Sequence, residues 1–441
     1  MPAHLADSAI YRGLFGDAET GRLFTDAAEI RAMLLVEGAL ARVQGAAGMI
    51  PAEAAAMIDR ASREVEIDPA ALAGETAVNG VPVPALVAAF RAVLPAGAAA
   101  WVHWGATSQD IVDTALALRL ARAIDFWDGR LSALAGTLGV LAAAAADMPM
   151  AARTYGQAAV PTTFGTVVAG WGRPVLRHRA ALAGVRAGVA QVSLAGAAGT
   201  LSAMGPGGPA CRAALAAALG LGDPGTGWHV ERDGIAGLAG WAAALAGTLG
   251  RMGEDLILLT QTGIGEVAVA GAGASSTMPQ KANPVGPSAL VALARHAQAL
   301  AAAVQAAALH RQQRDGAAWF AEWLALPPLA ITTGRALALA VDLAGRIAPR
   351  PEAMARALEA EGGAVMAEAL TFALAARMPR PEAAAEVKRL VAAAAAEGRP
   401  LRALAEAAHP ALDWAAEVTG PGWLGTAPAE ARAFAAAATG G

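Results

Sequence analysis

The feature that most constrains the fold is a long stretch without proline that begins at Ser108 and stops just before Pro149. It reads SQDIVDTALALRLARAIDFWDGRLSALAGTLGVLAAAAADM and is dominated by alanine and leucine, which are among the strongest helix formers. Thr107 or Ser108 can cap its start, and Asp110 places a negative charge in the first turn. The stretch therefore predicts one helix of about forty residues, which spans roughly 60 Å, about twice the width of a small domain.

Three more long runs have the same helical composition, with most prolines at their boundaries. They extend over residues 161–196, 233–262 and 287–313. Pro174 falls inside the first of them and predicts a kink there. The sequence has no alternating strand pattern of useful length and no internal repeat, so we predict an all-α fold.

Helices of this length that are apolar on most faces cannot all be covered within one subunit. We therefore predict a central bundle shared between copies of the chain in an oligomer, with a large monomeric bundle as the alternative. The composition divides the chain into an N-terminal helical domain at 1–105, a central long-helix bundle at 106–350 and a C-terminal small helical domain at 351–441.

The composition narrows the class of protein. A formal net charge of −4 argues against a nucleic-acid binder, which normally has a basic face. The single cysteine, Cys211, excludes an internal disulfide, suits a reducing compartment and is expected to be a buried apolar residue. The start, MPAHLADSAIYRG, has no signal-peptide pattern, and the apolar run ALVALARHAQALAAAVQAAAL carries Arg295 and His296, as in a buried helix rather than a membrane span. We predict a soluble cytoplasmic protein with no nucleic-acid or membrane partner.

Two polar segments stand out near the starts of long helices. WVHWGATSQD, at 101–110, precedes the longest helix, where free amides and the positive end of the helix dipole favour an anion. RTYGQAAVPTTFG, at 153–165, is interpreted as a loop that joins two long helices. The polar groups that these segments offer are His103, Thr107, Ser108, Thr154, Tyr155 and Gln157. The alternative for each segment is ordinary structure, a helix cap in the first and a turn in the second.

Two further segments carry charged or nucleophilic groups. GAGASSTMPQKANPV, at 271–285, combines flexible glycines with Ser275 and, six residues later, Lys281. A serine hydroxyl becomes a base only where amides and a nearby cation stabilise its alkoxide, and this segment has those parts. In HRQQRDGAAWFAEW, at 310–323, Arg314 can clamp a carboxylate and the tryptophans can wall a pocket. The alternatives are a mobile loop and a helix end with packed aromatic side chains.

Together these segments resemble the active-site segments of the fumarase/aspartase superfamily. SSTMPQKANP is similar to the signature loop of that family, HWGATSQD to its first segment and TYGQAAVPTTFG to its second, in the family's order and over nearly the whole chain. The resemblance implies a three-part all-α fold, a homotetramer with a core of long helices, and active sites assembled from three subunits. It also implies elimination or addition next to a carboxylate, generally without a cofactor or a metal.

The resemblance assigns expected roles to single residues. Ser275 matches the base that acts on the carbon next to the substrate carboxylate, and Lys281 and Asn283 match the residues that hold this carboxylate and its aci form. The candidate catalytic residues are Ser275, Lys281 and His103. The candidate substrate-binding residues are Thr107, Ser108, Tyr155, Gln157, Ser276, Met278, Asn283 and Arg314.

One departure from the family pattern concerns the second segment. Tyr155 stands where most members have a histidine that acts in acid catalysis, which disfavours adenylosuccinate and argininosuccinate lyases. Glu266 matches the glutamate that often partners this histidine, and His103 is a candidate to take over part of the proton transfer. The cycloisomerase branch of the family lacks the histidine, and GATSQDIVDTALALRL, VPTTFGTVVAGW and RDGAAWFAEWLALPPL resemble it. Gln280 and Ala282 replace the usual histidine and arginine of the loop, which bears on how a third carboxylate is held.

The resemblance to the cycloisomerase branch implies a specific reaction. Enzymes of that branch interconvert 3-carboxy-cis,cis-muconate, a small tricarboxylate, and 4-carboxymuconolactone in protocatechuate breakdown by the β-ketoadipate pathway. Ser275 is then expected to deliver the proton to the new C–H bond. One alternative is a related lyase that releases fumarate, as adenylosuccinate lyase does. The other is a helical scaffold without activity, which the intact Ser275, Lys281 and Asn283 disfavour.

Overall fold

The computed structural model describes residues 5–271, 273–274, 277–278 and 281–440, and these are predominantly helical. The expected all-α fold is thereby confirmed. The chain divides into two compact units. Unit 1 comprises Met1–Arg130, His178–Gly247 and Ala292–Ala338, and unit 2 comprises Leu131–Arg177, Thr248–Val291 and Leu339–Gly441. The division into three sequence domains stays a prediction.

The predicted long helix is α8 (Ser108–Ala144), which has 37 residues. Its first turn contains Asp110, as expected, and the Asp110 carboxylate accepts a hydrogen bond from the Thr107 backbone N–H at 3.0 Å. This contact ties the residue before the helix to its first turn, as the glutamate of a capping box does. After the helix the chain enters strand β1 (Pro149–Thr154), so the proline stands at the expected boundary.

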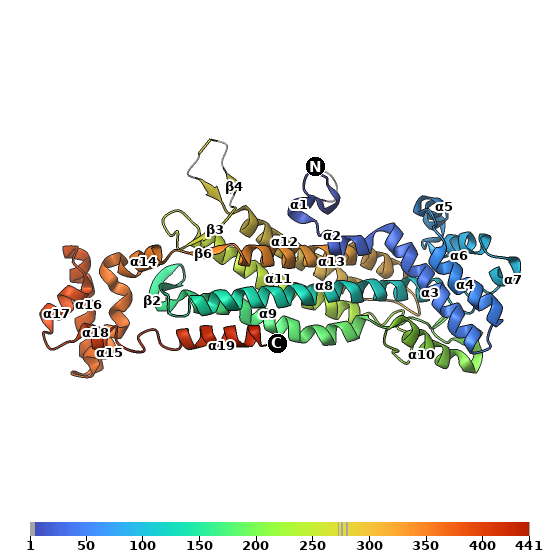
Figure 1. The fold of residues 1–441 in the computed structure, drawn as a ribbon. Coiled ribbons are helices and arrows are strands. Elements are labelled where there is room, and N and C mark those ends of the chain that lie inside the picture. The colour runs from blue at the N-terminus through green and yellow to red at the C-terminus, as the bar shows by residue number, and fades with distance from the viewer. Residues whose placement is uncertain (1–4, 272, 275–276, 279–280, 441) are drawn as a thin grey trace. The chain divides into compact units, whose positions relative to one another are not determined.

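The other long helices are α9 (Phe164–Val189), α11 (Asp233–Leu259), α12 (Val285–Ala307) and α13 (Gly316–Ala344) (Figure 1). Each of them, like α8, has residues in both units. Pro174 lies inside α9, and the helix continues beyond it. The helix expected at 287–313 already ends at Ala307. In the following turn Gln312 has a φ of 54°, a left-handed conformation that a continuing helix does not allow.

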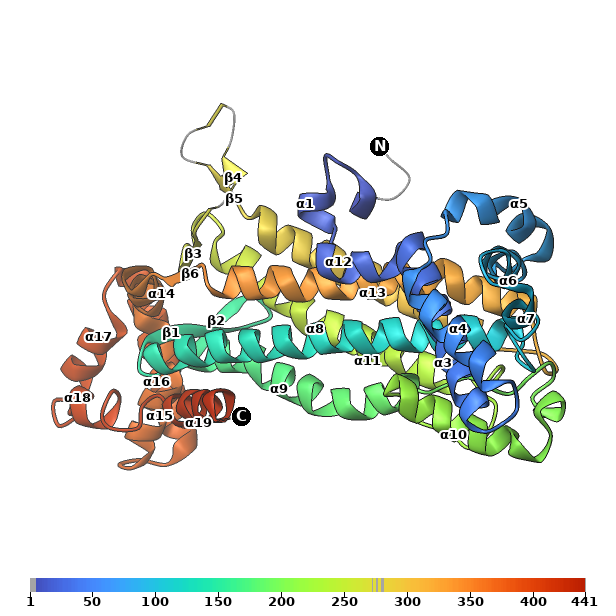
Figure 2. The ribbon, with the colours of Figure 1, turned by 45° about the vertical axis from the view of Figure 1, so that its right-hand side comes forward.

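In unit 1, helices α3 (Asp26–Ala46) and α4 (Ala52–Glu64) lie side by side (Figures 1 and 2). Gly38 permits this close approach, because a Cβ at that position would lie 2.0 Å from the Ser62 Oγ. Thr25 caps α3 by accepting a hydrogen bond from the Ala28 N–H. The apolar core here includes Met33, Leu34, Ile58, Leu86, Phe90, Val102 and Ile111, all buried. This core therefore holds α3 against the turn that precedes α8.

Short strands are the main difference from the expected fold. β1 pairs antiparallel with β2 (Gln157–Thr163), β3 (Val267–Val269) with β6 (Ile347–Pro349), and β4 (Gly273–Ala274) with β5 (Ala282–Asn283). Thr154 and Gln157, which we expected in a loop, are instead opposite each other in β1 and β2. Tyr155 and Gly156 form the two-residue turn between them with φ of 52° and 75°, as in a type I′ hairpin. Strands this short, without alternation of polar and apolar residues, leave no strand signal in the sequence.

In unit 2 the C-terminal helices form a core of their own. They are α14 (Pro351–Gly363), α15 (Ala367–Ala375), α16 (Arg380–Glu397), α17 (Leu401–Ala408) and α18 (Trp414–Glu417), and their core includes Leu370, Leu374, Leu390, Leu401 and Trp414. The last helix, α19 (Ala427–Thr439), packs on α9. A Cβ at Gly172 would lie 2.0 Å from the Phe434 ring, so this contact requires glycine.

The shorter elements complete the described chain. They are η1 (Leu5–Asp7), α1 (Arg12–Phe15), α2 (Ala18–Gly21), η2 (Arg22–Phe24), α5 (Pro69–Asn79), α6 (Val83–Ala92), α7 (Ala96–Ala99), η3 (Ser202–Gly207), α10 (Gly208–Leu219) and η4 (Ala364–Met366). Cys211 is buried in α10, as expected, and burial raises the pKa of its thiol to about 11. The thiol is therefore protonated and unreactive at neutral pH.

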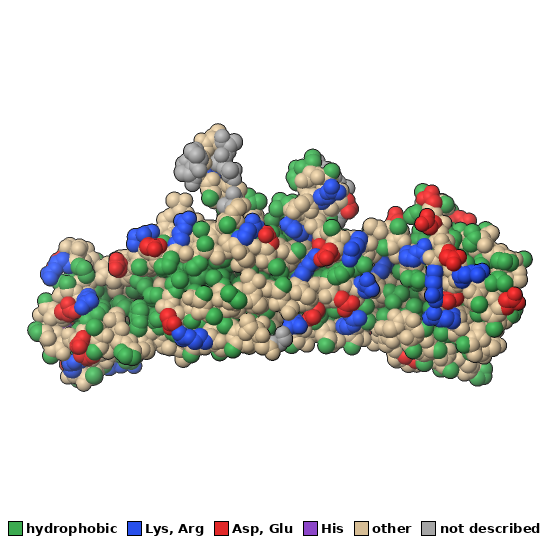
Figure 3. Space-filling view, in the orientation of Figure 1, with side chains coloured by type: hydrophobic (Ala, Val, Ile, Leu, Met, Phe, Trp, Pro, Cys, Tyr) green, Lys and Arg blue, Asp and Glu red, His purple; other side chains and the backbone are tan. Residues whose placement is uncertain are grey.

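The surface and the most apolar helix bear on the predicted partners. Among the described helices, α13 has the length and composition of a membrane span, but 61% of its most apolar window is buried inside the protein. On the face drawn in Figure 3, the described Lys and Arg side chains are interspersed with Asp and Glu. That face therefore offers no extended basic field of the kind that binds nucleic acid.

Candidate active site

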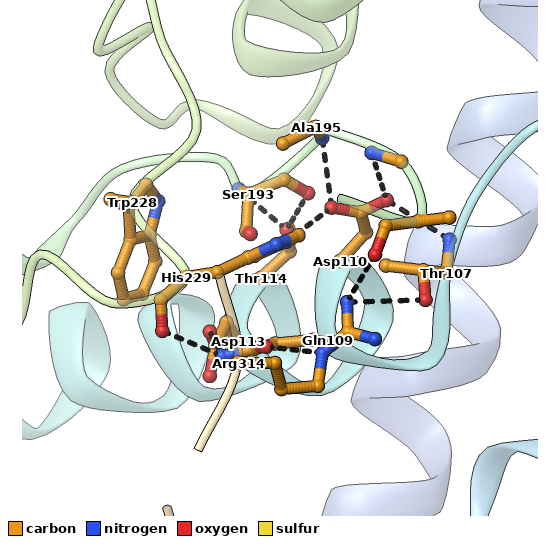
Figure 4. A network of polar contacts seen from close by, with 12 residues as sticks. Thr107, Gln109, Asp110, Asp113, Thr114, Ser193, Ala195, Trp228, His229 and Arg314 are labelled. Atoms are coloured by element: carbon orange, nitrogen blue, oxygen red, sulfur yellow. Dashed lines mark hydrogen bonds and ion pairs between the residues drawn. The ribbon is translucent and has the colours of Figure 1, made fainter. Parts of the chain in front are cut away.

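The start of α8 is held by one buried carboxylate, that of Asp110 (Figure 4). Its Oδ2 accepts hydrogen bonds from the backbone N–H groups of Thr107 and Gly196, both at 3.0 Å. Its Oδ1 accepts from the Ala195 N–H at 2.8 Å and contacts His229 Nε2 at 2.8 Å. Asp110 thus fixes the helix start to the loop at 193–196 and leaves the half-buried Thr107 beside it.

One turn further along α8, the Thr114 hydroxyl joins the same loop. It donates to the Ser193 carbonyl at 2.9 Å and accepts from the Ser193 N–H at 2.8 Å. The Trp228 indole N–H donates to the Val192 carbonyl at 3.0 Å. The loop is therefore held by side chains on both sides, and its backbone groups are satisfied without a strand or helix.

A fully buried arginine lies below this layer. Arg232 donates to Asp113 at 2.8 and 3.3 Å and to both oxygens of Glu322, and none of the three side chains is more than 1% exposed. The Trp228 ring stacks on the guanidinium at 4.7 Å. Burial lowers the pKa of Arg232, but the two carboxylates outweigh it and raise that pKa. Burial and the nearby Asp113 charge raise the pKa of Glu322 even though Arg232 opposes them, because one cation faces two carboxylates.

Arg314 is held at the start of α8 by this network (Figure 4). Its Nε donates to Gln109 Oε1 at 2.8 Å, and one Nη lies 3.4 Å from the Thr107 hydroxyl. The Gln109 amide is itself oriented, because its Nε2 donates to Asp113 at 3.2 Å and to the His229 carbonyl at 2.9 Å. Arg314 is therefore an exposed cation with a fixed position beside a helix start, an arrangement suited to a carboxylate.

His103 lies in the turn between α7 and α8. Its Nδ1 is 2.6 Å from Glu37 Oε1, and the two side chains are 18% and 1% exposed. The expected aromatic pocket wall is not formed by Trp319, because that ring is buried in the core of unit 1, with Trp323 against it at 4.6 Å. The segment after Arg314 is thus partly the packed aromatic helix end that the sequence left as an alternative.

Lys281 and Asn283 lie in unit 2. Asn283 ends β5 opposite Gly273, and the Lys281 N–H donates to the Met278 carbonyl at 3.0 Å. Lys281 and Asn283 line a cavity of about 790 Å³, together with Arg350. The described lining of the cavity holds more basic than acidic side chains, so it suits an anionic ligand.

Tyr155 and Glu266 do not form the pair that a histidine at 155 would allow. Tyr155 is fully exposed at the tip of the β1–β2 hairpin. Glu266 is fully buried, and both of its oxygens accept hydrogen bonds from Arg153, at 2.7 and 2.9 Å. This bidentate ion pair gives Glu266 a structural partner in place of a histidine.

The predicted residues fall into two groups. His103, Thr107, Ser108 and Arg314 belong to unit 1, and Tyr155, Gln157, Met278, Lys281 and Asn283 belong to unit 2. Ser275 and Ser276 lie outside the described residues. The residues of this network that were not predicted from the sequence are Glu37, Gln109, Asp113, His229, Arg232 and Glu322. Part of the signal was present, since positions 109, 110, 113 and 114 put four polar residues on one face of an apolar helix.

The chain is similar to known proteins over most of its length. Residues 11–298 match the model of a family described as lyase. A Pseudomonas aeruginosa protein named 3-carboxy-cis,cis-muconate cycloisomerase is 38% identical over 401 residues, which cover 90% of this chain and 87% of the relative. A Bradyrhizobium diazoefficiens protein of the same name is 39% identical over 383 residues, which cover 86% and 85%.

A solved structure gives the same likeness. It is the crystal structure of 3-carboxy-cis,cis-muconate lactonizing enzyme from Pseudomonas putida. The two folds superpose with a TM-score of 0.91 at 34% sequence identity, and the match covers 98% of this chain and 99% of the other.

Proposed function

Because the chain belongs to the lyase family that includes fumarase and aspartase, we propose that it interconverts 3-carboxy-cis,cis-muconate and 4-carboxymuconolactone. The observation that carries this proposal is the likeness, over nearly the whole length, to relatives that bear this name. Tyr155 in place of the histidine adds support, because it separates the chain from the lyases that depend on that histidine.

The proposed reaction is an addition within one molecule. A carboxylate oxygen of the substrate attacks a C=C bond, so that a C–O bond forms and the π bond breaks. The electron pair moves onto the carbon next to another carboxylate, which becomes an aci-carboxylate until that carbon takes up a proton. Donors already in place where this charge develops lower the barrier.

The described residues supply donors of two kinds. Arg314 is proposed to hold a substrate carboxylate that stays ionised throughout the reaction. Its position suits this role, because Gln109 and the start of α8 fix it. Lys281 and Asn283, which line the cavity of unit 2, are proposed to hold the aci-carboxylate. Ser275 is proposed as the general acid that protonates the carbon and as the base in the ring-opening direction.

We propose that the active form is a cytoplasmic homotetramer with shared active sites. Large apolar side chains on the long helices support an assembly, since Val140, Leu258 and Leu324 are 66%, 52% and 80% exposed in the single chain. Light scattering of the purified protein tests this, and a monodisperse active monomer would contradict it.

The experiment that tests the function is an ultraviolet assay with 3-carboxy-cis,cis-muconate. The native protein is expected to remove the conjugated-diene absorbance, and Ser275→Ala to lower the rate by about 10²–10⁴-fold, the usual share of general acid–base catalysis. Ser288→Ala serves as the matched control, because Ser288 is exposed on α12 outside the cavity lining.

Each result has a clear reading. No turnover by a folded native protein would refute the cycloisomerase proposal and direct the search to substrates that release fumarate. Equal rates for Ser275→Ala and Ser288→Ala would leave the reaction in place and remove Ser275 as its acid and base.

A further inference from the structure

The backbone at His103 is held in an uncommon conformation. Its φ of 64° lies in the left-handed region, which residues other than glycine seldom adopt. The carbonyls on both sides accept hydrogen bonds from side chains, Val102 from Arg91 at 2.9 Å and Trp104 from Gln44 at 2.7 Å. Such a conformation persists only where its surroundings over-determine it, and it is found mostly at functional sites. The turn thus fixes where the His103 side chain starts.

The His103 ring is fixed as well. Its Nδ1 lies 2.6 Å from Oε1 of Glu37, which is 1% exposed on the inner face of α3. The other Glu37 oxygen has no hydrogen-bond partner among the described residues. A buried carboxylate is costly without a compensating positive charge, and the imidazole is the partner in contact with it. The pair is therefore most stable when the imidazole is protonated.

Other charges near the ring act in both directions. Burial lowers the pKa of His103, but the charge and hydrogen bond of Glu37 from α3, helped by Asp110 from α8, outweigh it and raise that pKa. Arg91 from α6 opposes this rise. The ring thus carries a positive charge over a wider pH range than a histidine in water.

We propose that Glu37 is a positioning residue that keeps His103 as a fixed imidazolium, whose Nε2–H binds a substrate carboxylate. Glu37 occupies Nδ1 in either protonation state, and only the protonated ring has a second N–H to donate. This inference rests on the proposed function and adds a cation of unit 1 to those that hold the tricarboxylate. It also gives a reason for the left-handed turn, which a helix cap alone does not require.

The first test measures the protonation of His103 without using activity. The seven histidines are labelled in the ring, titrated by NMR in the native protein, and the His103 signal is assigned by its loss in His103→Gln. In Glu37→Gln the His103 pKa is expected to fall by at least about one unit, as removal of an opposite charge in contact with a group does. Glu53→Gln removes an exposed carboxylate of α4 and should leave the signal unchanged.

The second test measures whether the substrate carboxylate binds the charged His103 ring. In the native enzyme kcat/KM is expected to fall as pH rises through the His103 pKa, and this fall is the alkaline limb of the pH profile. In Glu37→Gln the limb should move to lower pH by as much as the His103 pKa measured by NMR falls. The limb should be absent in His103→Gln, and adding Glu37→Gln to that variant should change nothing more. Glu37→Asp, which keeps the charge, should restore much of the native profile.

The outcomes separate the possible failures. An unchanged His103 pKa in folded Glu37→Gln would overturn the proposal, and so would a limb that stays in place while the pKa falls. A loss of thermal stability alone, without movement of the limb, would leave Glu37 with a purely structural role. If Glu37→Gln does not fold, the native titration and the Glu37→Asp variant test the proposal instead. A native His103 pKa that is not raised, or a pH profile of Glu37→Asp that does not resemble the native one, would overturn it. If the native protein does not turn over the muconate, the proposed function fails, whereas the NMR titration still decides whether Glu37 keeps the ring charged.

Discussion

Replacement of Arg232 by methionine tests the buried layer below the site. The substitution keeps much of the side-chain volume but removes the positive charge that, among the described residues, contacts two buried carboxylates, those of Asp113 and Glu322. Loss of one partner from a buried ion pair costs about 3–5 kcal/mol, and here two pairs are broken by one change. We therefore expect Arg232→Met to lower the free energy of unfolding by about 5 kcal/mol at neutral pH.

Glu322→Gln is the matched comparison, because it removes one negative charge from the contact in which Arg232→Met removes the positive charge. With one guanidinium between two carboxylates, the layer carries an excess negative charge. The pKa of Glu322 is raised by burial and, in addition, by the charge of Asp113. The glutamine amide oxygen can still accept from Arg232, so this variant should change stability by no more than about 1 kcal/mol. The two substitutions thus differ severalfold although both remove one charge.

The pH dependence of these variants has a definite sign. A group whose pKa is raised by folding stabilises the protein below its unfolded pKa, and this contribution is lost as pH rises through the folded value. Native stability should therefore fall as pH rises through the raised pKa of Glu322, and Glu322→Gln should lack this fall. In Arg232→Met two buried carboxyl groups lose the cation between them, which favours their neutral forms, so its deficit should be larger at about pH 8 than at about pH 5.

The assay is urea denaturation followed by tryptophan fluorescence, at one protein concentration for all variants because the proposed assembly would add to apparent stability. Equal losses for Arg232→Met and Glu322→Gln would refute the argument from excess negative charge. A deficit of Arg232→Met that does not depend on pH would show that lost packing, rather than unpaired carboxylates, causes its instability.

Three further substitutions test the rest of the site. Arg314→Ala should raise KM by about 10–100-fold with little loss of stability, since one hydrogen-bonded charge on an exposed side chain is removed, and steady-state kinetics measures this. Arg153→Met should cost about 3–5 kcal/mol by leaving Glu266 buried and unpaired, which a melting curve detects as a large drop in Tm. Thr114→Val should cost about 1–3 kcal/mol because the Ser193 backbone loses a donor and an acceptor, and hydrogen exchange of the Ser193 amide should rise accordingly.

The long helices could be predicted from the sequence because their signals are local. Alanine-rich composition and the absence of proline before Pro149 define α8 without knowledge of its neighbours. The β1–β2 hairpin could not be found in this way. Its turn places Tyr155 at a positive φ, and tyrosine is not a residue that signals such a turn.

The candidate site residues could be named from the sequence, but the contacts that support them could not. Thr107, Ser108 and Arg314 stand out because they are polar residues in segments that resemble known active-site segments. Their supporting contacts join residues far apart in the chain, as where Arg232 meets Asp113 across 119 positions. No local pattern encodes such a pairing, because it exists only once α8, α13 and the residue before α11 have packed together.

The bidentate pair between Arg153 and Glu266 also bears on how such enzymes change in evolution. A histidine introduced at position 155 would meet a Glu266 carboxylate that already accepts two hydrogen bonds from Arg153, so it would have to share Glu266 with that arginine or displace it. Release of Glu266 needs a second change at position 153, and a chain that makes this change first buries an unpaired carboxylate. The two states are thus separated by a valley in stability.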